Sequence, residues 1–163
     1  MRTNRSAGIR AAALTLACMA ACGMAQAQLL IGQTAGMSGS VAASVNETIA
    51  GAQLVIDAVN AQGGIHGEKI EVLRMDDAFD VKRAGENARV LIEQKQVLAM
   101  FMTRGTPHTQ AIIPQLDQHD VALIAPSTGA MVLHQPLQKH VFNVRSTYQR
   151  EAQKAVEHLG TVG

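Results

Sequence analysis

The sequence predicts an α/β fold with a doubly wound, mostly parallel sheet and helices on both faces. Short apolar runs alternate with longer segments of helical periodicity, the order expected of repeated strand–helix–strand units. Three of the runs, at 29–35, 97–102 and 121–125, are almost continuously apolar, as in strands covered on both faces. Glycine, proline and hydroxyl residues follow these runs and mark the turns.

The individual elements follow from these periods and from their end signals. Strands are expected at 29–35, 69–75, 97–102, 121–125 and 141–144. Helices are expected at 46–61, 81–94, 107–116 and 148–159. Asp80 is the expected N-cap of the second helix, and Thr106 that of the third, with Pro107 in the first helical position. Gly63 and Gly160 are expected just beyond the ends of the first and last helices.

Residues 1–27 resemble a targeting segment and not a part of the fold. Basic residues Arg2, Arg5 and Arg10 precede an apolar run at 11–21, and Ala25-Gln26-Ala27 provides small residues for a cleavage site. This order predicts a secretory signal peptide cut after Ala27, and hence a periplasmic mature domain at 28–163. The alternative is an unprocessed N-terminal anchor, although the run is shorter than the ~20 residues of a spanning helix.

Both cysteines, Cys18 and Cys22, lie in the signal segment, so the mature chain has no disulfide, cysteine nucleophile or thiolate metal site. Cys22 follows small residues and is an alternative lipid attachment site, which Met19 disfavours because leucine usually occupies that position. No later apolar stretch approaches membrane-spanning length, so stable membrane insertion is not expected after cleavage.

The composition excludes several classes of function. Without the three arginines of the signal, the 14 Lys and Arg residues become 11 against 13 Asp and Glu, a net charge near −2. A nucleic-acid-binding domain would carry a clustered basic face, which is absent. The six histidines show no metal-ligand spacing and are expected to be mostly solvated, so no metal is predicted. Neither a cofactor nor a catalytic residue is predicted.

Candidate binding residues follow the strands, where ligands bind in doubly wound sheets. Three loops carry small and hydroxyl residues, at 37–40, 104–109 and 126–129. As an N-cap, Thr106 would present its hydroxyl beside free helix amides, a favourable place for a carboxylate. Ser127 and Thr128 would add donors from the next strand end. Each of these residues is equally suited to ordinary capping and turn roles.

A nicotinamide-dependent oxidoreductase is a remote alternative. Gly32, Gly36 and Gly39 follow the first strand, but their spacing is GxxxGxxG and not GxGxxG. Tyr148 is not followed four residues later by the lysine of a short-chain dehydrogenase; Ala152 stands there. The sequence also lacks GxSxG, Walker A and HExxH motifs.

Several segments resemble the leucine/isoleucine/valine-binding proteins of ABC importers, a branched-chain amino-acid-binding family. They are IGQT at 31–34, MSG at 37–39, GA at 51–52, NAQGGIHG at 60–67, DDAFD at 76–80, IAPST at 124–128 and FNVR at 142–145. The resemblance implies a type I periplasmic binding fold, in which two lobes close over a small ligand without catalysis. It also implies ABC permease subunits as partners.

The resemblance places ligand-binding residues in the loops after the third and fourth strands and in the SG turn. The matching positions are Gly105, Thr106, Ser127, Thr128, Gly129, Ser38 and Ser44. Gly129 stands where the family has a threonine, and Ser44 where it has an aromatic wall. These departures leave an amino acid, an amide, an aromatic acid or another small carboxylate open as the ligand.

The expected function is solute binding for an ABC importer, and the alternative is a periplasmic ligand-sensing receptor lobe. Family members are more than twice as long, so the chain is expected to be the N-terminal lobe alone, as a fragment, a truncated reading frame or a decayed gene. A half cleft covers less of a ligand than the usual ~70–90%, so the chain alone is expected to bind weakly or not at all.

Overall fold

A single parallel sheet forms the centre of the computed structural model, which describes residues 28–162. Its strands are β1 (Gln28–Ala35), β2 (Lys69–Asp76), β3 (Ala99–Phe101), β4 (Ala122–Ile124) and β5 (Val141–Phe142). They are arranged in the order β2-β1-β3-β4-β5, with every neighbouring pair parallel. The doubly wound parallel α/β fold is therefore confirmed. The strand order reverses beside β1, which places a topological switch point between β1 and β3.

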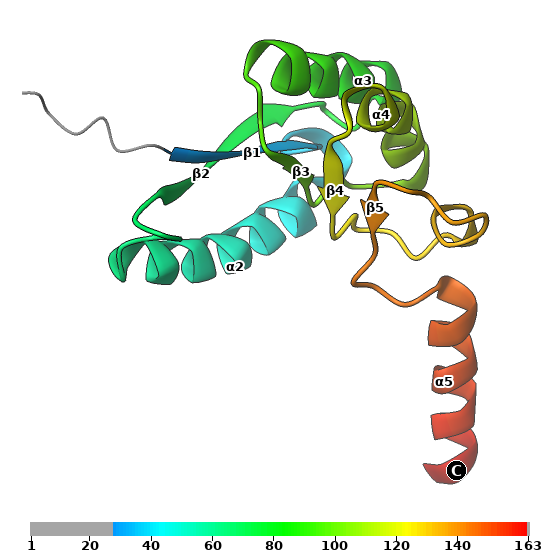
Figure 1. The fold of residues 1–163 in the computed structure, drawn as a ribbon. Coiled ribbons are helices and arrows are strands. Elements are labelled where there is room, and N and C mark those ends of the chain that lie inside the picture. The colour runs from blue at the N-terminus through cyan, green and yellow to red at the C-terminus, as the bar shows by residue number, and fades with distance from the viewer. Residues whose placement is uncertain (1–27, 163) are drawn as a thin grey trace, which may run out of the picture.

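Helices cover the two faces unequally, as Figure 1 shows. Helix α2 (Ala42–Ala61) lies on one face, while α3 (Val81–Arg89) and α4 (Thr106–His119) lie side by side on the other. A π-helical turn, η2 (Val90–Gln94), continues α3. The main core lies between the sheet and α3, η2 and α4. Its buried residues are Ala88, Leu91, Ile92, Val97, Met100, Ile112, Leu116, Leu123 and Val141.

The face under α2 is more polar and partly open. Arg74 donates to Gln33 Oε1 (3.2 Å) and to Gln53 Oε1 (2.6 Å), so a hydrogen-bonded network joins α2 to β1 and β2. Farther along the sheet, Ile124 and Phe142 are paired neighbours on β4 and β5 and are 41% and 55% exposed. Helix α2 thus protects the β1–β2 half of this face and leaves the β4–β5 half in contact with water.

The element boundaries differ from the sequence-based expectations mainly at turns. Helix α2 begins at Ala42, after the 3₁₀ turn η1 (Gly39–Val41), and not at Asn46, whose side chain donates to the Met37 carbonyl (3.3 Å). The Asp80 cap is confirmed, since its carboxylate accepts from the Arg83 amide at 2.7 Å. Strands β3, β4 and β5 are shorter than expected: β3 and β4 both begin later and end earlier, and β5 ends earlier.

The last helix, α5 (Tyr148–Val162), points away from the sheet (Figure 1) and has no buried residue. It runs through Gly160, which was expected to end it. A Cβ at Gly160 would meet nothing within 4 Å, and this glycine does not adopt the left-handed conformation of a C-cap. In the described part of the chain, no helix is long and apolar enough to span a membrane. The predicted signal peptide and Cys22 lie outside the described residues.

Candidate ligand-binding edge

Loops from three strands meet at the carboxyl edge of the sheet, around the switch point. They are the segments 36–41 after β1, 102–105 after β3 and 125–130 after β4. The last two are joined directly, because Ser127 N donates to Thr103 O at 2.7 Å and Arg104 and Ser127 form a parallel bridge. The candidate residues Gly105, Thr106, Ser127, Thr128 and Gly129 are therefore brought together, as expected of neighbouring parallel strands.

The start of α4 differs from the expectation in one respect. Gly105, and not Thr106, is the N-cap, and Thr106 and Pro107 are the first two helical residues. Gly105 has a φ of 91°, and a Cβ there would lie 2.8 Å from His108 Nδ1, so only glycine fits this position. The prediction that Thr106 caps the helix is wrong, because its side chain turns toward the loop after β4.

A chain of three hydroxyls joins α4, this loop and α5, and we refer to it as the hydroxyl chain. Thr106 Oγ1 lies 2.7 Å from Thr128 Oγ1, which lies 3.0 Å from Tyr148 Oη. Thr128 is fully buried and also accepts from the Ala130 amide at 3.3 Å. Its bond to Tyr148 is the main reason that the pKa of Tyr148 is lowered. The Thr128 hydroxyl is thus occupied by partners within the protein.

Gly129 is buried under the segment that leads into α5. Its carbonyl accepts from Tyr148 N at 2.8 Å, and a Cβ at this position would lie 2.5 Å from Ser146 O. Glycine therefore permits a close approach of two backbones. A family threonine at this position would require the 146–148 segment to move.

The two serines near the first turn lie at the same edge but have partners of their own. Ser38 donates its amide and hydroxyl to Asp76, whose carboxylate also accepts from the Met37 and Ala78 amides at 2.8 Å each. The Ser38 hydroxyl, followed by the Ala78 amide, holds the pKa of Asp76 at about 2. Ser44 donates to the Val41 carbonyl at 3.1 Å. Asp76 thereby fastens the loop after β1 to the loop after β2.

The second aspartate of the DDA segment has a structural role as well. Asp77 is fully buried, accepts from the Phe79 amide (2.9 Å) and is hydrogen-bonded to the Thr34 hydroxyl (3.1 Å). Burial raises the pKa of Asp77.

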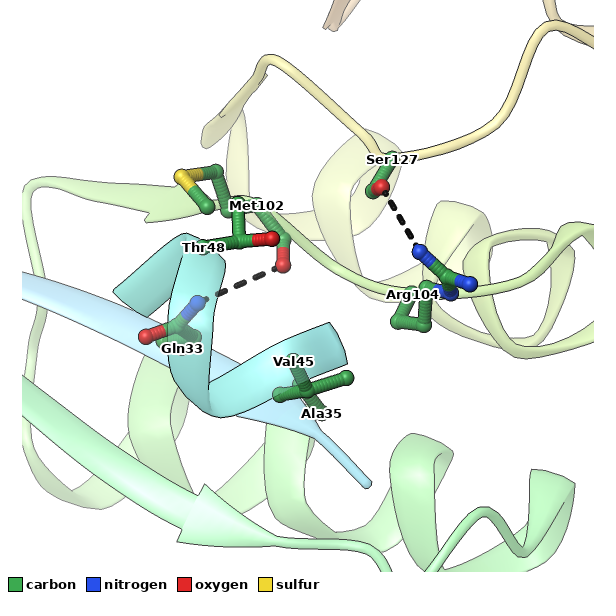
Figure 2. A pocket seen from close by; sticks show the side chains of 7 residues that line it. All are labelled: Gln33, Ala35, Val45, Thr48, Met102, Arg104 and Ser127. Carbon is green, nitrogen blue, oxygen red and sulfur yellow. Dashed lines mark hydrogen bonds between the residues drawn. The ribbon is translucent and has the colours of Figure 1, made fainter. Parts of the chain in front are cut away.

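A recess opens at the switch point on the α2 side, and its empty volume, including open solvent, is about 220 Å³ (Figure 2). Its lining comprises Gln33, Ala35, Val45, Thr48, Met102, Arg104 and Ser127. Of the predicted site residues only Ser127 lines it. Figure 2 shows Arg104 facing Ser127 across the loops, with Nη1 3.5 Å from the serine oxygen. The position of Arg104 at the start of a strand-end loop was visible in the sequence, whereas Gln33 and Thr48 lie inside a strand and a helix and carried no signal.

Two histidines expected to be solvated or near ligand are buried. His108 is 5% exposed and stacks on Phe79 with ring centroids 4.3 Å apart, and neither ring nitrogen has a hydrogen-bond partner. His140 is 8% exposed, with Nδ1 2.8 Å from Asp117 and Nε2 2.7 Å from Asp120. Asp117 and then Asp120 raise the pKa of His140. The described residues contain no cluster of three metal-ligating side chains.

A doubly wound parallel sheet with a recess at its switch point is found in the lobes of α/β solute-binding proteins and in other proteins that bind small ligands at that place. A possible leucine/isoleucine/valine-binding protein from Rhodopirellula baltica shares this fold at a TM-score of 0.79 and 24% identity, over 88% of this chain and 38% of that one. The family model described as "Periplasmic binding protein" matches residues 28–163, and the chain belongs to this family. It is a family of binding proteins and not of enzymes, which removes the oxidoreductase alternative.

Two further relatives carry more sequence identity. The branched-chain amino acid transporter substrate-binding protein LivJ from Streptococcus pneumoniae, solved with isoleucine, is 31% identical at a TM-score of 0.69, over 74% of this chain and 34% of that one. The Leu/Ile/Val-binding protein BraC3 of Rhizobium johnstonii is 29% identical over 146 residues, 88% of this chain and 38% of the relative. The chain spans less than two fifths of the length of each of these relatives.

Proposed function

We propose that residues 28–163 form one lobe of a periplasmic solute-binding protein that serves an ABC importer. The observation that carries the proposal is a recess at the switch point, lined by β1, by α2 and by the loops after β3 and β4. The ligand is an amino acid or a related small carboxylate or amide. A relative with 31% identity is seen with isoleucine, which supports this class of ligand. The permease subunits of the importer are the proposed partners.

The proposed site consists of Gly105, Thr106, Ser127, Thr128 and Gly129, with Ser38 and Ser44 forming a wall at the turn after β1 and the start of α2. Two of these residues would not contact the ligand with a side chain. Gly129 is buried and could contribute only its backbone, and the Thr128 hydroxyl is already bonded to Thr106, so it would act by positioning its neighbours. The groups available at this edge are the first amides of α4 and, at the recess, the side chains of Arg104 and Ser127, which share only a long contact of 3.5 Å. Amides at a helix N-terminus favour an anionic group such as a carboxylate.

The test is a titration of ¹⁵N-labelled residues 28–163 with the twenty amino acids and their simple amides, followed by backbone amide shifts. A half cleft should bind with a dissociation constant of about 1 mM or weaker, since few contacts are formed. We expect the shifts to be concentrated in the segments 36–48, 102–107 and 126–130, with none in α5 beyond its first turn. Shifts confined to the opposite edge of the sheet would contradict the proposed site, and micromolar affinity would contradict the half-cleft expectation.

The proposed location is tested separately. Expression of the whole chain in a bacterium with a periplasm, followed by fractionation and mass spectrometry, should give an exported product that begins at Gln28. A cytoplasmic product that retains Met1, or a lipid-modified product that begins at Cys22, would contradict cleavage after Ala27.

A further inference from the structure

The recess at the switch point contains one charged side chain, Arg104. Arg104 lies in the loop after β3, is half-buried, and lies against the loop after β4. Among the described residues, its side chain has one hydrogen bond, a long one of 3.5 Å to Ser127 Oγ. In the part of the chain that the structure describes, no carboxylate lies within 4.0 Å of its guanidinium.

The surroundings of Arg104 differ from those of the other arginines at 28–162. Arg89 and Arg145 are paired with glutamates, and Arg74 is held by two glutamines. Arg83 and Arg150 are exposed to water. Arg104 alone in this segment combines partial withdrawal from solvent with a single weak acceptor. A guanidinium so placed has several unused donors directed at a small space, and a planar carboxylate matches them in charge and geometry.

The other residues that line the recess also favour an anionic group over a cationic one. Besides Arg104 they are the neutral polar side chains of Gln33, Thr48 and Ser127 and three apolar ones, so none of them carries a carboxylate that could receive an ammonium group. The residue after Arg104 is the N-cap of α4, so the partial positive charge of this helix N-terminus lies at the same edge of the sheet, although no residue of α4 lines the recess. The mature chain is acidic overall, so this positive site is local and does not belong to a basic surface.

We propose that Arg104 anchors the ligand through a carboxylate, and that this lobe recognises small monoanionic acids without requiring an α-ammonium group. This inference rests on the proposed function and specifies the ligand class of the same site. The guanidinium donates to the carboxylate while Ser127 Oγ donates from the neighbouring loop. Apolar contacts from Val45 and Met102 receive the first carbons of the ligand.

Four compounds that share one carbon skeleton test the proposal: leucine, 4-methylpentanoate, leucinamide and 4-methylpentanamide. Each compound is titrated to a concentration of about 50 mM into ¹⁵N-labelled residues 28–163. The buffer contains little salt, because contacts of partly exposed charges are screened at higher ionic strength. Both the backbone amides and the Arg104 Nε–Hε signal are followed. We expect 4-methylpentanoate to bind at least as tightly as leucine, and the two amides to bind about tenfold more weakly or worse.

Arg104→Gln should reduce binding of 4-methylpentanoate about tenfold and leave the circular dichroism spectrum and urea midpoint nearly unchanged. The matched control is Arg83→Gln, which removes the same charge from an exposed position on α3, across the sheet from the recess, and should leave the affinity unchanged. Acids that bind equally well to the Arg104→Gln variant would overturn the anchor and leave the proposed function standing. Amides that bind as tightly as acids would overturn the anionic preference. No shift with any of the four compounds would contradict both this inference and the proposed function.

Discussion

Replacing Thr128 by valine tests whether the hydroxyl chain holds the candidate edge together. Valine has the shape of threonine, so the substitution removes the hydroxyl without opening a cavity. Thr128 Oγ1 has contacts with Thr106 Oγ1 (2.7 Å), Tyr148 Oη (3.0 Å) and the Ala130 amide (3.3 Å). The two short bonds contribute about 1 kcal/mol each, and leaving partly buried partners unpaired adds to the cost. We therefore expect Thr128→Val to lower the free energy of unfolding by about 2–3 kcal/mol.

Circular dichroism in urea is the suitable assay, since the chain has no tryptophan and a single tyrosine. For a domain of this size the loss corresponds to a fall in melting temperature of roughly 6–12 °C. The control is Thr48→Val, because Thr48 is exposed and its hydroxyl donates within its own helix to Ser44 O at 2.7 Å. That change should stay within about 0.5 kcal/mol of the wild type.

A double-mutant cycle separates the hydroxyl pair from other effects. Thr106→Val removes the same 2.7 Å bond from its other side, so the Thr106/Thr128 double variant should cost less than the sum of the two single variants. Two results would refute the reasoning. One is a Thr128→Val variant as stable as the Thr48→Val control, and the other is strict additivity in the cycle.

Three further predictions concern parts of the fold outside the candidate edge. The raised pKa of His140, caused by Asp117 and Asp120, means that its contribution to stability is present below about pH 6.5 and is lost as pH rises through the folded-state pKa. The wild type should accordingly lose stability relative to His140→Gln between pH 6.5 and alkaline pH in urea titrations, and parallel pH profiles would contradict this. Gly51→Ala, whose Cβ meets nothing within 4 Å in α2, should stabilise the domain by about 0.5–1 kcal/mol, whereas Gly160→Ala in the unpacked α5 should leave the urea midpoint unchanged. In hydrogen-exchange mass spectrometry α5 should exchange much faster than α4, because no α5 residue is buried, and equal protection would show that α5 packs in solution.

Local patterns in the sequence were enough to predict the fold class. The strand and helix periods and the Asp80 cap appear in the structure, since they depend on burial and on neighbours along the chain. The expectation that β4 is covered on both faces is wrong, because α2 does not reach it and Ile124 is 41% exposed. The ends of the elements were predicted less well. Gly105 adopts a left-handed conformation that a glycine permits but does not require, and Gly160 leaves its helix uninterrupted. A glycine in the sequence shows only that the backbone can adopt a positive φ, and the contacts around it determine whether it does.

The candidate site was predicted in position but not in detail. Parallel strands bring their carboxyl ends to one edge, so the loops carrying Thr106 and Ser127 could be expected to meet. The partners of the side chains depend on contacts that are distant in sequence. Tyr148 closes the hydroxyl chain from 20 residues beyond Thr128, and Asp76 binds Ser38 from 38 residues away. No spacing rule connects such residues.

The size of the recess indicates which part of a ligand this edge of the sheet would contact. Its empty volume of about 220 Å³ includes open solvent, so the recess is a shallow wall that can contact one end of a ligand and does not enclose a whole one. The Asp76 contacts and the hydroxyl chain hold the surrounding loops before any ligand arrives, which lowers the entropy lost on binding. Arg104 and Ser127 remain available because the neighbouring polar groups are bonded to one another. This lobe should therefore determine the charge class of a ligand, while selection among side chains of similar acids must come from surfaces outside the recess.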